Sequence, residues 1–375
     1  MRPTYLEVNL SQLKQNLENI RAHVAPAKVL VVLKANAYGH GVDGVAPFIA
    51  PFADYIGVAI AEEGIHLRKL GITTPILIMG GTFVEQLPEF LEYDLTLAAS
   101  SLDLLTAAEQ LAGSAGKPIK THLKIDTGME RIGVREYEAE ALIEKSLACS
   151  HVDVEGIFTH FANSETIDDS LPSNAREVKA SLQLERFQEV LSIYEKRSAP
   201  HPQIRHMANS GATLRMPESY YDMVRPGVLF YGVYPGRDIE KTIEVKPALK
   251  WKSKVVFSKL TLPGRGVSYG SLWQAEEQTR IVTVPCGYAD GYFRRMTNRP
   301  RVLINGKSYP QVGRICMDQF MVNVGGDDIK VGDEVTLLGN GIIPEELADW
   351  AGTNEYEVMT NISARVPRVF MGAVQ

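Results

Sequence analysis

Cysteine is scarce in this chain of 375 residues. Only Cys149, Cys286 and Cys316 are present, and no two of them form a CxxC pair. An odd number of widely spaced cysteines argues against a disulfide framework and against a zinc site. We therefore expect no bound metal and a reducing compartment, the cytoplasm.

Long apolar runs and basic clusters are missing as well. No uninterrupted apolar run reaches about 18 residues, the length that a membrane-spanning helix needs. Residues 1–17 lack the apolar core of a signal peptide. The formal net charge is −6, and no cluster of Lys and Arg accompanies it, which argues against a nucleic-acid partner. We expect neither a membrane span nor a signal peptide nor bound nucleic acid.

Strand and helix patterns alternate over the first part of the chain. A helix is expected after Asn9, a capping residue with Gln12 three positions later. Further helical spacing occupies 62–71, 101–112 and 181–197. The strand-like runs lie at 29–34, 55–60, 76–79, 95–98, 121–125, 154–159, 204–208 and 221–224. Eight such units favour a (β/α)8 TIM-like barrel, with an open doubly wound sheet as the alternative.

The pattern changes after residue 238. Short strand-like runs now alternate with Gly, Pro and Asn, and Asn305-Gly306 is a strong hairpin signal. Helical spacing returns only at 344–352 and 356–363. Because 375 residues exceed one ordinary domain, we predict a barrel over residues 1–238 and a mostly-β C-terminal domain over residues 239–375.

Chemistry is expected where barrel strands end, because active sites of TIM barrels lie at the carboxyl ends of the strands. Candidate residues stand at or just after the ends of five of the expected strands: Lys34 at the first, Lys124 and Arg131 at the fifth, His160 at the sixth, Asn209 and Ser210 at the seventh, and Arg225, Gly227 and Val228 at the eighth. The sequence therefore predicts one polar site at this end of the barrel.

Lys34 follows an almost wholly apolar strand. A lysine in such surroundings must be paired, shifted in pKa or covalently bonded, unless its ammonium group reaches past the strand end to water. The following Ala-Asn-Ala-Tyr-Gly-His-Gly favours a lysine that forms a Schiff base with a cofactor.

The seventh and eighth strands end in a possible anion site. Ser210 offers a hydroxyl group, and Pro226-Gly227 can open a helical turn whose N–H groups bind phosphate. Each motif is also a common turn, and their joint placement supports the anion site. Taken singly, Arg225 is most simply an anion partner, His160 a core histidine and Arg131 a surface residue. In the β domain, Tyr269 fits a structural turn and Met317 ordinary packing.

Taken together, nine segments resemble alanine racemases. They span nearly the whole chain in order: VLKANAYGHG (32–41), LKIDTGMERIGV (123–134), GIFTHFANSE (156–165), MANSGA (207–212), MVRPGVLFYG (223–232), GRGVSYG (264–270), CGYADGY (286–292), VGRICMDQFMV (312–322) and NEYEV (354–358). The combination is specific and outweighs the ordinary explanation of each segment.

The resemblance implies a barrel plus β domain, pyridoxal 5′-phosphate (PLP) as cofactor and a head-to-tail homodimer with shared active sites. Lys34 would match the Schiff-base lysine and Tyr269, from the other subunit, the second base. Cofactor ligands would be Tyr38, His160, Asn209, Ser210, Arg225, Gly227, Val228 and Tyr356, with Arg225 beside the pyridine nitrogen. Arg131 and Met317 would lie at the substrate carboxylate. Family members often carry a carbamylated lysine where Lys124 stands.

The implied reaction is the interconversion of L- and D-alanine by proton transfer between two bases on opposite faces of Cα. It would supply D-alanine for peptidoglycan. A serine or broad-specificity racemase would share this machinery, because an apolar pocket discriminates a methylene or hydroxyl only modestly. A PLP decarboxylase of the same architecture would place an acidic residue where Arg225 stands, and a PLP carrier would lack the β domain.

Overall fold

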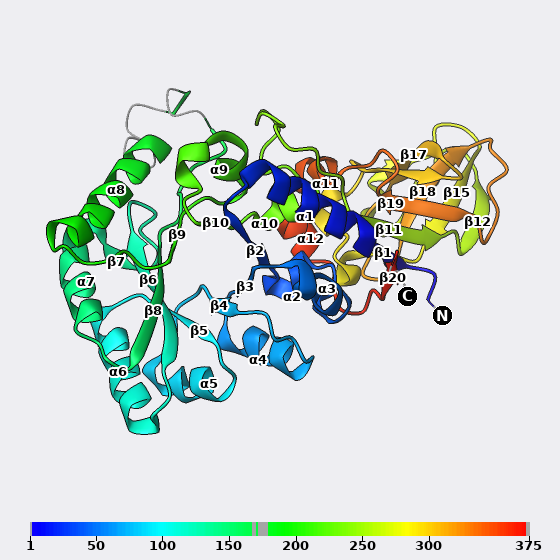
Figure 1. Cartoon of the computed structure of the whole chain (residues 1–375). Helices are drawn as coiled ribbons and strands as arrows, with labels where there is room; N and C mark the ends of the chain where they lie inside the picture. Colours follow the sequence, from blue (N-terminus) through cyan, green and yellow to red (C-terminus); the bar gives the residue numbers. More distant parts are fainter. Residues whose placement is uncertain (1, 167–169, 172–178, 373–375) are drawn as a thin grey trace. The chain divides into compact units, whose positions relative to one another are not determined.

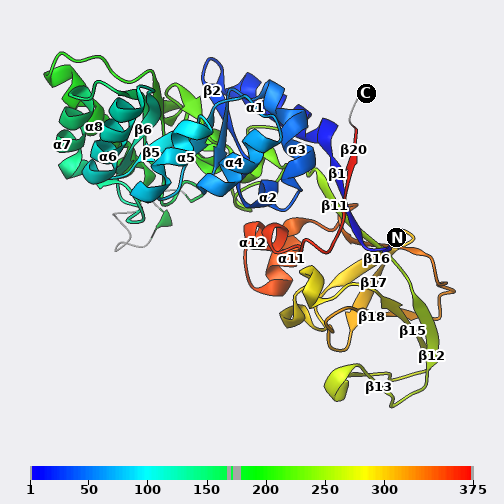
Figure 2. The same ribbon diagram turned by 90° about the horizontal axis from the view of Figure 1, so that it is seen from below.

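The structure is a computed structural model that describes residues 2–166, 170–171 and 179–372 (Figures 1 and 2). The chain forms two compact units. The barrel unit comprises Lys14–Ala37 and Asp43–Val245, and the β unit comprises Met1–Leu13, Tyr38–Val42 and Lys246–Gln375. Two short N-terminal segments thus group with the C-terminal part of the chain. The boundary expected between residues 238 and 239 stays a prediction.

Parallel strands build the barrel unit, in the order β10-β2-β3-β4-β5-β6-β8-β9. Their bounds are β2 Lys28–Val32, β3 Tyr55–Val58, β4 Ile76–Ile78, β5 Thr96–Ala99, β6 Ile119–Asp126, β8 Val152–Phe158, β9 Ile204–His206 and β10 Met223–Val224, and β7 (Val134–Arg135) pairs with β6. Backbone hydrogen bonds from Asp222 to Arg205 (3.0 Å) and from Arg225 to Ala208 (2.8 Å) join the two ends of this path. The TIM-like barrel is therefore confirmed and the doubly wound alternative is wrong.

Helices separate the strands of the barrel unit, as the blue-to-green part of Figure 1 shows. Their bounds are α1 Leu10–Val24, α3 Val42–Ile49, α4 Ala61–Lys69, α5 Leu87–Glu92, α6 Leu102–Ala115, α7 Ala139–Leu147, α8 Ala180–Lys196, α9 Ser210–Arg215 and α10 Gly227–Phe230. The expected cap of α1 is confirmed, because the Asn9 side chain accepts a hydrogen bond from the Gln12 N–H at 3.0 Å. No helix in the described part of the chain is long and apolar enough to cross a membrane.

The β unit contains a second sheet, in the order β12-β15-β18-β17-β16-β19-β11-β1-β20. Its elements are β1 Tyr5–Asn9, β11 Leu249–Lys254, β12 Phe257–Thr261, β15 Thr279–Val284, β16 Arg301–Ile304, β17 Lys307–Val312, β18 Phe320–Gly325, β19 Glu334–Leu338 and β20 Arg368–Met371, with a ribbon of β13 Gly266–Val267 and β14 Trp273–Gln274 and helices α11 Pro344–Ala351 and α12 Glu355–Thr360. Asn305 and Gly306 both have positive φ, 50° and 82°, which confirms the expected hairpin.

Strand β1 was not predicted from the sequence. This strand pairs antiparallel with β11 and parallel with β20. Leu6 and Val8 alternate with outward-facing residues and are fully buried, which is the period-two pattern of a strand with one buried face. The segment is short and its partners are far along the chain, so the alternation alone was too weak to assign it.

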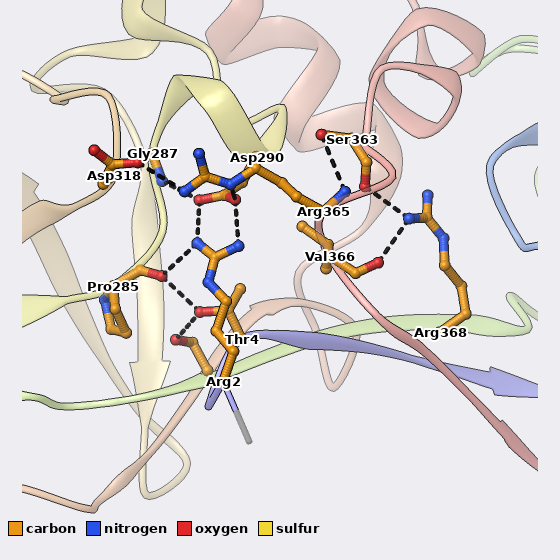
Figure 3. Close-up of polar contacts among 11 residues, drawn as sticks. Arg2, Thr4, Pro285, Gly287, Asp290, Asp318, Ser363, Arg365, Val366 and Arg368 are labelled. Atoms are coloured by element: carbon orange, nitrogen blue, oxygen red, sulfur yellow. Dashed lines mark hydrogen bonds and ion pairs between the residues drawn. The ribbon is translucent and has the colours of Figure 1, made fainter.

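A buried carboxylate holds the N-terminal segment to the rest of the β unit (Figure 3). Asp290, whose side chain is fully buried, accepts hydrogen bonds from both terminal nitrogens of Arg2, at 2.6 and 2.7 Å. It also pairs with Arg365 at 2.8 Å and accepts from the Gly287 N–H at 2.9 Å. A carboxylate taken out of water needs such partners, so these contacts compensate for its burial.

We expect Asp290→Asn to lower the free energy of unfolding by roughly 3 kcal/mol, because it leaves two guanidinium groups without their buried counter-charge. Urea unfolding monitored by tryptophan fluorescence would measure the loss. The control is Asp318→Asn: Asp318 also pairs with Arg365, at 2.7 Å, but its side chain is 62% exposed. That change should cost less than about 1 kcal/mol. Equal losses would show that burial of Asp290 is not what matters.

Candidate active site

Lys34 lies just beyond β2, at the carboxyl end of the first barrel strand. The next four residues have φ values between 49° and 55°, so the segment drawn as α2 (Lys34–Tyr38) is a left-handed turn. Residues other than glycine rarely adopt this conformation, which costs about 1–2 kcal/mol each. The carboxylate of Glu63 holds the turn by accepting hydrogen bonds from the N–H groups of Ala35 (2.6 Å) and Ala59 (2.8 Å).

The turn leads into a glycine corner that belongs to the β unit. Gly39 has φ +79°, and a Cβ atom at this position would lie 2.1 Å from the carbonyl oxygen of Met359. Arg368 donates two hydrogen bonds to the Gly39 carbonyl, at 3.0 and 3.1 Å. The ring of Tyr38 lies 6.1 Å from the ring of Tyr356 on α12, measured between centroids. The structure therefore brings two of the predicted phosphate ligands together.

Arg225 follows β10 and is buried. One terminal nitrogen donates to Nδ1 of His206 at 2.8 Å. The other lies within hydrogen-bond distance of the carbonyls of Thr159 (2.7 Å) and Met207 (3.1 Å) and of Nδ1 of His160 (3.2 Å). Burial lowers the pKa of Arg225 to about 9. Four acceptors on neighbouring strand ends therefore hold this guanidinium group in one orientation.

The basic side chains predicted at the strand ends shift one another's pKa values. Burial lowers the pKa of Lys34, and the charges of Arg131 and Arg225 lower it further. Burial also lowers the pKa of Lys124, to about 7. The pKa of His160 falls well below its ordinary value through burial and through the charges of these four residues. Such a concentration of positive charge favours an anionic ligand.

A hydrogen-bonded loop carries Arg131. One carboxylate oxygen of Asp126, at the end of β6, accepts from the N–H groups of Gly128 and Met129 (2.9 Å each) and Glu130 (3.1 Å). The other oxygen accepts from the Arg131 N–H at 3.0 Å. Burial by itself raises the pKa of Asp126, but these backbone donors outweigh it and lower the pKa. An ionised Asp126 therefore fixes the backbone from which Arg131 projects.

The first turns of α9 and α10 lie side by side. The Asn209 side chain caps α9, and the Ser210 hydroxyl accepts a hydrogen bond from the Leu229 N–H of α10 at 3.3 Å. The first N–H groups of a helix lack partners inside the helix and are available to an anion. The structure therefore places Ser210 beside the first turn of α10, and an anion site formed by Asn209, Ser210, Gly227 and Val228 stays a prediction.

Tyr269 and Met317 share one surface of the β unit. Both are exposed, to 71% and 52%, respectively. They line a hollow of about 1490 Å³ in this unit. The preceding Ser268 has a positive φ of 66° and donates a hydrogen bond to the Arg314 carbonyl at 2.7 Å, so the loop that presents Tyr269 is fixed.

Four polar residues that support the site were not predicted from the sequence. Glu63 holds the turn after Lys34, and His206, His122 and Glu155 continue inward from Arg225. Their signal was the presence of a charged or polar residue on an apolar helix face or strand, where burial demands a partner. That signal does not identify the partner.

The fold and site define a barrel protein with a β domain, a partly desolvated lysine after the first strand and two adjoining helix starts after the last two strands. A family model for the alanine racemase N-terminal domain matches residues 8–235, and one for the C-terminal domain matches residues 248–370. The chain belongs to the alanine racemase family.

Individual relatives agree with this assignment. The alanine racemase of Carboxydothermus hydrogenoformans is 43% identical, over 99% of this chain and all of that relative. A solved alanine racemase of Clostridium difficile 630 has a TM-score of 0.91 at 38% identity, covering 99% of this chain and 96% of that one. The same protein has been solved in complex with cycloserine, with a TM-score of 0.89, 37% identity and coverage of 100% and 98%.

The left-handed turn makes a prediction about Ala35, which is exposed and has φ 52°. Ala35→Gly should raise the free energy of unfolding by about 0.5–1 kcal/mol, because the relief of the left-handed conformation exceeds the entropy that glycine adds to the unfolded chain. The control is Ala53→Gly, at φ −92° and ψ 140°, which should lower it by a similar amount. Urea unfolding measures both changes, and a destabilising Ala35→Gly would contradict the argument.

The low pKa of Lys124 predicts a pH-dependent stability. Between its folded pKa of about 7 and the unfolded value of about 10.4, the unfolded chain binds more protons at this residue than the folded chain does. The free energy of unfolding of the apoprotein should therefore rise with pH across this window. In CO2-free buffer the rise should be smaller in Lys124→Met. Lys120→Met, which removes a more exposed lysine of the same strand, should leave it as in the native protein.

Proposed function

We propose that this protein is an alanine racemase that interconverts L- and D-alanine, with PLP as its cofactor and Lys34 as the residue that carries it. The observation that carries the proposal is the group of basic side chains at the strand ends, where Lys124 and Arg225 are buried, Lys34 is half-buried and Arg131 is exposed. Burial and the charges of Arg131 and Arg225 lower the pKa of Lys34. A lysine needs such a shift to act as a nucleophile and as a base near neutral pH. The names of the relatives support alanine as the substrate.

The residues present fit PLP. The hydroxyl of Ser210 and the first N–H groups of α10, at Gly227 and Val228, would hold its phosphate, together with Tyr38 and Tyr356. Asn209 would also contribute to the cofactor site. Arg225, a rigid donor, would face the pyridine nitrogen and keep it unprotonated, and His160 would pack beside it. When bound, the cofactor supplies an electron sink that acidifies the Cα–H bond of the amino acid.

Arg131 and Met317 would bind the substrate carboxylate. Arg131 is well suited because its backbone is fixed by Asp126.

We also propose that Lys124 is carbamylated. With a pKa of about 7, much of this amine is neutral at pH 7, and its nitrogen can attack CO2 to form a carbamate with release of one proton. The anionic product would attract Arg131, whereas an ammonium group repels it. Intact-mass measurement under CO2 would show one added CO2, absent in Lys124→Met.

Racemisation needs a second proton-transfer group on the opposite face of Cα, and we assign it to Tyr269 of a second copy of the chain. Lys34 would hold or remove the proton on one face, and the Tyr269 hydroxyl would return it on the other. The exposure of Tyr269 and Met317 in the β unit supports a role at an interface, where a partner would cover them. We therefore propose a head-to-tail homodimer whose active sites are shared.

The product D-alanine would serve peptidoglycan synthesis. A cytoplasmic location is in keeping with this role and with the three free thiols of Cys149, Cys286 and Cys316. Alanine is proposed above serine because the relatives bear the name alanine racemase.

The activity is tested by loading the protein with PLP and following the interconversion of L- and D-alanine by polarimetry. We expect Lys34→Ala and Tyr269→Phe each to lower the rate about 1,000-fold or more, since each removes an acid/base group. Tyr309→Phe, which changes a tyrosine of the β unit outside the proposed site, should leave the rate unchanged. A protein that binds PLP through Lys34 but leaves alanine unchanged would refute the substrate assignment, and racemisation of serine or CO2 release would then identify the alternative.

Mixing the two inactive variants tests the shared site. If Lys34 works with the partner's Tyr269, a hybrid dimer contains one intact site, and subunit exchange should restore roughly a quarter of the native rate. If both groups came from one chain, every site in the mixture would lack one of them and no rate would return.

A further inference from the structure

A chain of buried polar groups leads from Arg225 into the middle of the barrel. Arg225 donates to Nδ1 of His206 at 2.8 Å. Nε2 of His206, on β9, lies 2.8 Å from Nδ1 of His122 on β6. Nε2 of His122 lies 3.3 Å from a carboxylate oxygen of Glu155 on β8. Both histidines are fully buried, so their ring nitrogens need these partners.

The two end groups of this hydrogen-bonded series, Arg225 and Glu155, set the direction of the hydrogen bonds within it. A guanidinium group has only donors, so Nδ1 of His206 must be an unprotonated acceptor. His206 is then the neutral Nε2–H tautomer and donates to Nδ1 of His122. By the same logic His122 carries its proton on Nε2 and donates to Glu155. An ionised carboxylate has only acceptors, so it completes the sequence without two donors facing each other.

The surrounding side chains are shaped around these rings. The His206 ring stacks on Phe158, with centroids 4.7 Å apart and an interplanar angle of 10°. Gly156 lies opposite His122 in the β6–β8 register, and a Cβ atom there would lie 2.5 Å from Nδ1 of His122. Glycine at this position therefore makes the space for the imidazole, and neither ring can turn freely.

Glu155 lies at the far end of the hydrogen-bonded series that starts at Arg225, and hydrogen bonds hold it there. Its carboxylate accepts a hydrogen bond from the Tyr55 hydroxyl, which also lies 2.6 Å from the hydroxyl of Thr96. Burial raises the pKa of Glu155, but the hydrogen bonds from His122 and Tyr55 outweigh it and lower the pKa. The side chain is 20% exposed. The acceptor that ends the chain is thus an anchored, ionised carboxylate.

We propose that Glu155 is a positioning residue which, by accepting the proton of His122, fixes the tautomers of both histidines and so keeps His206 as the acceptor that orients Arg225. The proposal deepens the proposed function and rests on it only for the contact of Arg225 with the cofactor. Without the carboxylate, the Nε2–H group of His122 is left buried without an acceptor. The arrangement in which both histidines carry their proton on Nδ1 then becomes similar in free energy to the native one. In that arrangement the Nδ1–H of His206 would point at Arg225.

The tautomers can be measured in the apoprotein. The chain contains eight histidines, and uniform ¹⁵N labelling of histidine with long-range ¹H–¹⁵N correlation spectra distinguishes protonated from bare ring nitrogens. In the native protein we expect the Nε2–H form at both His122 and His206. In Glu155→Leu, a measurable population of the Nδ1–H form should appear at His206. Glu155→Gln should restore the native pattern, because its amide oxygen can accept from His122.

The second measurement uses the enzyme loaded with PLP. Glu155→Leu should lower the racemisation rate about 10- to 100-fold, the range found when outer hydrogen-bond partners of metal-bound histidines are removed, and should shift the absorbance of bound PLP. Glu155→Gln should recover most of both. The control Asp153→Asn removes an exposed carboxylate from the same strand and should match the native protein.

Three results would overturn the proposal. The first is a native His206 protonated on Nδ1, which needs no variant and so holds even if Glu155→Leu fails to fold. The second is a Glu155→Leu protein with native tautomers and rate. The third is Asp153→Asn matching Glu155→Leu, which would make the effect one of general charge. If the native protein lacks racemase activity while the tautomers respond as expected, only the proposed function fails.

Discussion

The site depends on the burial of a guanidinium group inside a closed ring of strands. Arg225 loses its hydration, and the carbonyls of Thr159 and Met207 together with two histidines replace it. A buried charge with fixed acceptors cannot rotate to follow its surroundings. The charge of Arg225 also contributes to the lowered pKa values of Lys34 and Lys124, so the same buried guanidinium group influences both lysines.

Four consecutive residues after Lys34 have a strained, left-handed backbone, and hydrogen bonds hold both ends of this turn. The carboxylate of Glu63 secures the start of the left-handed turn. Arg368 secures its end through the Gly39 carbonyl. Strain of this kind persists only where neighbouring contacts over-determine the backbone. Here those contacts come from Glu63 on α4 and from Arg368 on β20.

Much of the fold could be predicted from local pattern. The eight barrel strands are short apolar runs between amphipathic helices, and the Asn305-Gly306 turn has a conformation that few other residue pairs adopt, so both were recognisable in the sequence. Strand β1 was missed because its stability comes from pairing with β11 and β20, which lie at the other end of the chain. The strand-end residues were predicted as one site because parallel strands bring their carboxyl ends to the same edge.

The sequence by itself determined the order of the elements, the membership of the alanine racemase family and the residue types available at the strand ends, because these follow from periodicity and motif. The tertiary structure alone decided which groups touch. It placed His122 opposite Gly156 and connected Arg225 to Glu155 by hydrogen bonds through two histidines. It also placed the carboxylate of Glu63 at the turn after Lys34. Hydrogen bonds and desolvation depend on distances of a few tenths of an ångström between residues far apart in sequence, and no local pattern specifies those distances.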